Sequence, residues 1–179
     1  GMSAKVKSMI QGVAVLACIA LVCGLLLGAV NHFTYVDPFQ STLDGFKEDS
    51  GAAGEFEMLI SEDTPVDGSS GIIKYYALST DGVHAFLASA TSQYGEVQLY
   101  VYIRDGQIYK IVLGSCTDDF SSDLTKGSFF EQFYGTDLSA LDPLTADNVS
   151  NATYSSTAAK NAIDAVAKYY NENLAGGER

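Results

Sequence analysis

A threonine at position 153 stands at the head of the most regularly periodic segment of the chain. Apolar residues after Ser156 recur at the i, i+3, i+4, i+7 spacing of an amphipathic helix, and we expect this helix to span residues 156–173. Ser155 or Ser156 is its expected N-cap. The first turn of a helix has unpaired N–H groups and the positive end of the dipole, so an anion attached to Thr153 would be stabilised there. The spacing therefore favours Thr153 as a phosphate-bearing residue.

Two simpler interpretations of this segment stay open. A stretch rich in Ser, Thr and Asn before a helix is commonly an ordinary loop and cap that binds nothing. Asn148-Val-Ser150 and Asn151-Ala-Thr153 are also overlapping N-glycosylation sequons, which would indicate only surface exposure in a secreted eukaryotic protein.

The segment also resembles the flavinylation motif of the FMN-binding domain family, which usually reads Asp-x-x-Ser/Thr-Gly-Ala-Thr. The matching residues are Asp147, Ser150, Ala152 and Thr153, followed by Ser155 and Ser156. The resemblance implies that FMN is joined to the Thr153 hydroxyl as a phosphoester by a magnesium-dependent flavin transferase that uses FAD. It also implies that Asp147 belongs to the sequence that the transferase reads. Asn151 replaces the usual glycine, and Asn is the non-glycine residue that best tolerates a positive φ.

Other segments extend the resemblance to the membrane-anchored members, which are the G subunit of the Rnf complex and the C subunit of the sodium-pumping NADH:quinone reductase. The matching segments are Gln93-Tyr94-Gly95-Glu96, Arg104-Asp105-Gly106-Gln107, Phe130-Glu131-Gln132-Phe133 and Asn31-His32-Phe33-Thr34. Residues 115–120 correspond only loosely to the Glu-Thr-Pro-Gly-Leu-Gly loop that lies near the flavin in the family. We expect Tyr94, Thr117 and Tyr154 to line the flavin ring, because aromatic faces and hydroxyls suit a partly exposed flavin.

The N-terminal segment is long and apolar enough to cross a membrane. Residues 12–30 are almost wholly apolar, and at about 1.5 Å per residue they would cover roughly 30 Å of hydrocarbon. Lys5 and Lys7 precede them, so the positive-inside rule places residues 1–11 in the cytoplasm and everything after residue 31 outside it. A cleaved signal peptide is the alternative, but its apolar core is normally only about 7 to 15 residues long. Lipoprotein processing at Cys18 is a further alternative, although the apolar run continues well beyond that cysteine.

The charge outside this segment is strongly acidic. All 22 Asp and Glu residues follow residue 30, whereas two of the ten Lys and Arg residues, Lys5 and Lys7, precede it, which leaves the remainder with a formal charge of −14. Such a surface disfavours nucleic acid and anionic lipid as partners. Cys116 is the one cysteine outside the apolar segment, so the sequence predicts neither an internal disulfide nor a cysteine-based metal site there. No catalytic triad or metal-ligand spacing emerges around the two histidines, so we assign no catalytic or metal-binding residues.

The middle of the chain predicts a small antiparallel sheet. Expected strands span residues 72–78, 83–90, 97–104 and 107–114, and the last two are joined by an Asp105-Gly106 hairpin turn. Between residues 99 and 104 apolar side chains alternate with Tyr100, Tyr102 and Arg104, so one face is apolar and the other is rich in tyrosine. Short helices are expected at residues 37–46 and 127–133. The result is an α+β fold with the terminal helix packed on the sheet.

These expectations combine into a single-pass membrane protein with a linker and short helix at residues 31–70 and an FMN-binding domain at residues 71–175. The resemblance implies an extracytoplasmic electron-carrier subunit of an Rnf-like, ion-translocating ferredoxin:NAD oxidoreductase complex, with other membrane subunits and a flavin transferase as its partners. Two alternatives remain: a degenerate FMN-binding domain that acts as a sensor or assembly factor, and a non-redox membrane-anchored surface domain.

Overall fold

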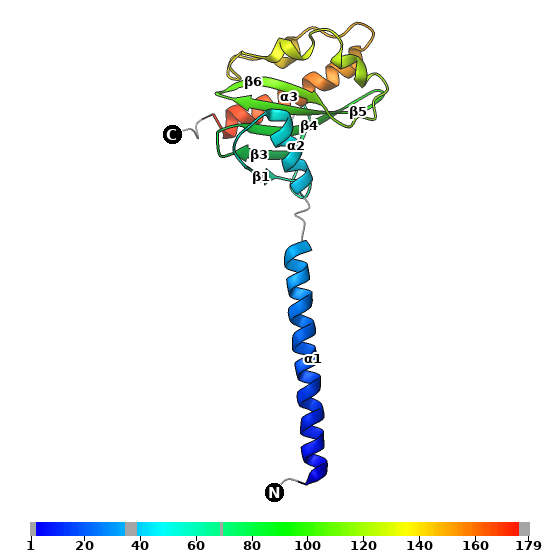
Figure 1. Cartoon of the computed structure of the whole chain (residues 1–179). Helices are drawn as coiled ribbons and strands as arrows, with labels where there is room; N and C mark the ends of the chain where they lie inside the picture. The colour runs from blue at the N-terminus through cyan, green and yellow to red at the C-terminus, as the bar shows by residue number, and fades with distance from the viewer. Residues whose placement is uncertain (1–2, 35–38, 69, 176–179) are drawn as a thin grey trace. The chain divides into compact units, whose positions relative to one another are not determined.

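The computed structural model describes residues 3–34, 39–68 and 70–175. Two units are distinct, Gly1–Gln40 and Ser41–Arg179. The first contains α1 (Ala4–Thr34), in which an 18-residue window has a mean hydropathy of 2.9. The large apolar side chains of this helix are exposed, and Figure 1 draws it as one continuous helix. By length and composition, α1 can therefore cross a membrane as the sequence predicted.

The second unit is an α+β domain built on an antiparallel sheet. Its strands are β1 (Phe56–Ile60), β2 (Val66–Asp67), β3 (Ile72–Ser79), β4 (His84–Ser92), β5 (Gly95–Arg104) and β6 (Gln107–Leu113). The strand order is β1-β3-β4-β5-β6. The short strand β2 lies off this path and pairs with the first two residues of β3, Ile72 and Ile73. In the central pair, Phe86 lies opposite Val101 and Ala88 opposite Leu99. The four predicted strands are confirmed as β3 to β6.

The turn between β5 and β6 confirms the predicted hairpin. Asp105 and Gly106 have φ angles of 54° and 74°, as a two-residue type I′ turn requires at both central positions. Gly82, with a φ of 86°, plays a comparable part between β3 and β4.

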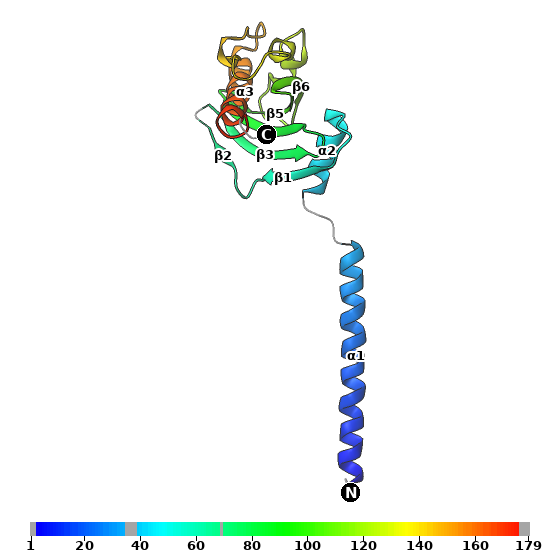
Figure 2. The same ribbon diagram turned by 90° about the vertical axis from the view of Figure 1, so that its left-hand side faces the viewer.

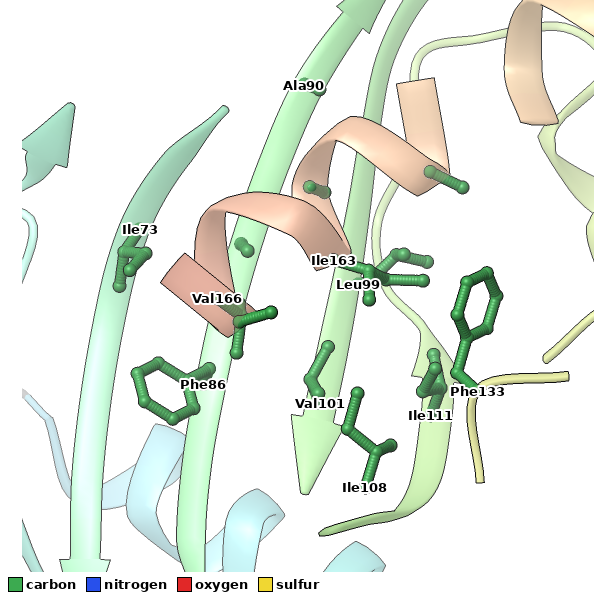
Figure 3. Packing of buried hydrophobic residues seen from close by; sticks show 14 of the residues in the cluster. Ile73, Phe86, Ala90, Leu99, Val101, Ile108, Ile111, Phe133, Ile163 and Val166 are labelled. Atoms are coloured by element: carbon green, nitrogen blue, oxygen red, sulfur yellow. The ribbon is translucent and has the colours of Figure 1, made fainter. Parts of the chain in front are cut away.

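One face of the sheet is covered by α3 (Thr153–Asn173), as predicted. Ile163 and Val166 of this helix pack against Leu99 and Val101 of β5, and all four side chains are fully buried (Figure 3). Phe133, from the segment between β6 and α3, closes the same cluster. The apolar half of the 99–104 alternation therefore forms the main core.

The tyrosine-rich face is also covered, and α2 (Gln40–Ser50) covers it. Figure 2 shows α2 and α3 on opposite sides of the sheet. Phe46 is fully buried, and its ring makes edge contacts with Tyr100 and Tyr102 at centroid distances of 5.9 and 6.3 Å. The expected linker at residues 31–70 therefore contains a core helix and two strands of the domain, while Asp37 and Pro38 lie outside the described residues.

The segment between β6 and α3 contains three short 3₁₀ helices. These are η1 (Ser121–Thr125), η2 (Phe130–Phe133) and η3 (Pro143–Thr145). The helix expected at residues 127–133 is therefore wrong in type and start, because Gly127 adopts a φ of 67° that no right-handed helix accommodates. Isolated bridges from Gln107 to Asp137 and from Ile108 to Tyr134 attach this segment to β6.

Candidate functional site

Thr153 is the first residue of α3, and its side chain is exposed. The expected N-cap at Ser155 or Ser156 is wrong, because the helix begins three residues before Ser156, with Ala152 as the N-cap. The side chain of Ala152 cannot accept a hydrogen bond, and the first intrahelical bond runs from the Ser156 amide to the Ala152 carbonyl, at 2.8 Å. The amides of residues 153–155 therefore have no acceptor within the helix, and Thr153 lies among them.

Asn151 makes the turn that leads the chain into α3. Its φ is 66°, which confirms the expectation of a left-handed backbone at this position. The turn buries Ala152, which is 3% exposed, and leaves Thr153 at the surface. Asn151 therefore supplies the left-handed backbone that places Thr153 at the surface.

The hydroxyls of Ser155 and Ser156 have partners inside the protein, and both residues are fully buried. Ser156 Oγ donates to the Ala152 carbonyl at 2.6 Å and accepts from the Val149 amide at 2.9 Å. Ser155 Oγ donates to Asp118 Oδ1 at 2.6 Å. These two serines thus hold the start of α3 in place, and their hydroxyls do not face solvent.

Asp118 is a buried carboxylate that joins three segments beside the helix start. It is 4% exposed, and Oδ1 accepts hydrogen bonds from Ser155 Oγ and from the Phe120 amide at 2.7 Å. Oδ2 accepts from Ser92 Oγ, at the end of β4. Burial by itself would raise the pKa of Asp118, but the hydrogen bonds from Ser155, Ser92 and the backbone outweigh it and hold the pKa below its usual value.

The loop before Thr153 is held by side chains at three successive points. Gln132 donates to the Asp147 carbonyl at 3.0 Å and accepts from the Asp147 amide at 2.8 Å. Lys160, only 8% exposed, donates to the Ala146 carbonyl at 2.9 Å. With the Ser156 contact, these bonds fix the backbone of residues 146–149. The sequence indicated a role for the 130–133 segment only through its resemblance, and nothing in it indicated Lys160.

An aromatic hollow lies directly beside Thr153. It has a volume of about 180 Å³ and is lined by Tyr94, Phe120, Asn151, Ala152, Thr153, Tyr154 and Ser155. The Tyr94 ring contacts the rings of Phe120 and Tyr154 edge-on, at centroid distances of 4.8 and 5.7 Å. These three aromatic side chains are 42%, 38% and 52% exposed, so the hollow presents ring surface to solvent. The structure therefore brings the predicted residues Tyr94 and Tyr154 to Thr153, and adds Phe120.

Thr117 is not among the residues that line this hollow. Its hydroxyl accepts a hydrogen bond from the Glu96 amide at 2.8 Å, which holds the 115–120 loop against the start of β5. The close approach depends on Gly95, which has a φ of 139° and where an added Cβ would lie 2.7 Å from the Thr117 carbonyl carbon. The contact of Thr117 with a ligand stays a prediction.

Asp147 and Ser150 line a second hollow. This hollow has a volume of about 430 Å³ and is lined by Lys126, Gly127, Ser128, Phe129, Gln132, Asp147, Asn148, Val149 and Ser150. Most of the predicted site residues therefore divide into two groups. Those at the aromatic hollow are Tyr94, Ala152, Thr153, Tyr154 and Ser155, and those at the second hollow are Asp147 and Ser150. Thr117 and Ser156 line neither hollow.

Among the described residues, no other group of side chains forms a catalytic or metal-binding arrangement. His84 is 5% exposed, and its Nδ1 lies 2.7 Å from the Tyr76 hydroxyl, which makes it a residue of the core. No group of three or more His, Cys, Asp or Glu side chains among the described residues is arranged to hold a metal ion. The start of α3 is therefore the best candidate site.

The chain matches no protein-family model, and a search of curated proteins finds no match either. The assignment of a function therefore depends on the residues and their geometry.

Proposed function

We propose that this protein is a membrane-anchored electron carrier whose FMN is attached to Thr153 through a phosphoester. The observation that carries the proposal is the exposed Thr153 hydroxyl at the uncapped start of a 21-residue helix, next to exposed aromatic rings. A phosphate at Thr153 would lie near amides that have no helical acceptor and near the positive end of the helix dipole.

The size of the aromatic hollow suits a tethered, partly exposed flavin. Pockets that enclose a ligand of this size have volumes of about 300 to 1,000 Å³. The hollow measures about 180 Å³, so it would hold one part of an isoalloxazine ring while the rest remained accessible to a redox partner. A covalent bond compensates for such shallow binding. The residues at the site therefore fit FMN in covalent form better than FMN in a dissociable form.

The flavin would supply the redox chemistry, accepting and donating electrons, and the protein would supply position and electrostatics. Tyr94, Phe120 and Tyr154 would contact the ring. Asp118 would fix the first turn of α3 through Ser155. No residue of the chain needs to act as an acid, base or nucleophile in electron transfer.

The proposal places the domain outside the cytoplasm. The apolar α1 would cross the membrane, and Lys5 and Lys7 before it favour a cytoplasmic N-terminus. An extracytoplasmic cofactor that dissociates is lost from the cell, which gives the covalent bond a function. The partners would be the membrane subunits of an Rnf-like complex that couples ferredoxin and NAD redox chemistry to ion movement, together with the flavin transferase during maturation.

The intact mass of the full chain, co-expressed with a flavin transferase, tests this proposal. We expect an increment equal to one esterified FMN, and flavin absorbance that persists after denaturation. Thr153→Ala should lose both. The matched control is Thr157→Ala, because Thr157 is also an exposed threonine, one turn later on α3, with its hydroxyl donating to the Thr153 carbonyl.

An increment that persists in Thr153→Ala would refute the attachment site. A colourless wild-type protein of unchanged mass would refute the function, and would favour the degenerate sensor or the non-redox surface domain.

A further inference from the structure

We propose that the buried carboxylate of Asp118 sets the redox potential of the flavin attached to Thr153. This inference rests on the proposed function and concerns a residue in the loop, residues 115–120, that matches the family only loosely. The carboxylate would lower the potential by placing a fixed negative charge directly behind the wall of the aromatic hollow.

The geometry places Asp118 one hydrogen bond from that wall. Its two partners at Oδ1, Ser155 and Phe120, both line the hollow. Its partner at Oδ2, Ser92, accepts a hydrogen bond from the amide of Tyr94, a third lining residue, at 3.0 Å. The carboxylate is thus connected to three sides of the site that the flavin would occupy.

The hydrogen-bond partners of the Asp118 carboxylate favour its ionised form. All its partners in the described structure are donors from hydroxyl or amide groups, and none is Lys or Arg. Such donors stabilise the ionised form, in line with the lowered pKa of this side chain. At 4% exposure the charge is screened by solvent far less than the surface carboxylates are.

A fixed negative charge opposes reduction of the flavin. Uptake of two electrons and one proton converts the neutral oxidised ring into a reduced ring with one negative charge, and charge near the ring nitrogens tunes this equilibrium. Like charges close to each other in a poorly screened site repel, so the ionised Asp118 lowers the midpoint potential.

The test is a reductive titration of the flavinylated full chain in detergent, with dithionite as the two-electron donor that is oxidised to sulfite. Asp118→Asn keeps the shape and removes the charge, and we expect a higher midpoint potential. Asp119→Asn is the matched control, because it removes the same charge from the neighbouring exposed residue. Its upward shift should be several times smaller.

Asp118→Glu separates charge from structure, because it keeps the negative charge and changes the packing of the buried side chain. We expect its midpoint potential to stay near that of the wild type, unlike that of Asp118→Asn. Simple loosening of the site would raise the midpoint potential of both variants, and that result would overturn the proposal. Equal shifts in Asp118→Asn and Asp119→Asn would also overturn it. Should Asp118→Asn fail to fold, a raised midpoint potential in Asp118→Glu, which retains the charge, would be decisive against the proposal.

Intact mass is measured first on every variant. A wild-type protein without the FMN increment refutes the proposed function. A fully flavinylated protein whose midpoint potential is the same in the wild type and in Asp118→Asn refutes only this inference.

Discussion

Replacement of Gly95 by alanine should disturb both the stability of the domain and the shape of the site. Gly95 opens β5, and its φ of 139° lies where residues with a side chain are strained. An added Cβ would lie 2.7 Å from the Thr117 carbonyl carbon and 2.8 Å from the Asp118 amide nitrogen. Ordinary contacts between such atoms are about 3.5 to 4.0 Å, so the 115–120 loop must move.

The magnitude follows from two separate costs. The unfavourable backbone conformation costs about 1 to 3 kcal/mol. The overpacking against backbone adds about 1 to 3 kcal/mol, because no flexible side chain can yield. The sum, about 2 to 6 kcal/mol, is a large part of the roughly 5 to 15 kcal/mol that keeps a typical domain folded.

Gly82→Ala is the matched control. Gly82 has a φ of 86°, but an added Cβ would meet nothing within 4 Å. Its cost is therefore the backbone term alone, about 1 to 2 kcal/mol. The difference between the two variants measures the close approach of the 115–120 loop to β5.

Urea unfolding of the full chain in detergent gives both free energies by linear extrapolation. Tyrosine fluorescence reports mainly on the domain, because ten of the eleven tyrosines follow residue 40 and the other is Tyr35. Equal losses in Gly95→Ala and Gly82→Ala would refute the packing of the loop on Gly95.

Two further predictions concern Asp118 and Phe46. The lowered pKa of Asp118 means that its ionised form stabilises the fold above the unfolded-state value of about 3.9, and that this contribution is lost as the pH falls through the folded-state pKa. The difference in free energy of unfolding between wild type and Asp118→Asn should therefore shrink below about pH 4, and a constant difference in pH-dependent urea titrations would contradict the assignment. Phe46→Ala should destabilise the domain by about 3 to 5 kcal/mol if α2 is part of the core, whereas a residue in a linker would change the same urea midpoint by less than about 0.5 kcal/mol.

The strands with strong local signals could be predicted from the sequence. The alternation from Leu99 to Arg104 predicted the two faces of β5, and the Asp105-Gly106 turn predicted its hairpin with β6. The register shift between Tyr102 and Ile103 was not predicted. The five-residue β1 has a register shift between Met58 and Ile60, which leaves too short a regular alternation to detect. The core role of α2 was hidden for another reason, because Phe46 is recognisable as a core residue only once its partner, the tyrosine face, is known.

The site was predicted where the chemistry is local and missed where it is not. The position of Thr153 near the helix start follows from the periodicity of the residues after it, and the positive φ of Asn151 was expected from the short motif around it. Asp118 meets Ser92 and Ser155 at separations of 26 and 37 residues, and no periodic pattern carries such pairings. The predicted start of α3 was too late because a serine at position 155 is a typical N-cap residue. In the structure the Ser155 hydroxyl instead donates a hydrogen bond to Asp118.

The side-chain bonds from Gln132, Lys160 and Ser156 to the loop at residues 146–149 have a consequence for maturation. The three donors or acceptors come from η2 and α3, so the loop reaches its shape only when both elements are in place. A transferase that reads Asp147 in this shape would meet a preorganised surface, and would not need to order a disordered peptide on binding. Under the proposed function, we expect the transferase to modify only chains that have completed folding. Bound flavin would then distinguish folded from unfolded chains before assembly.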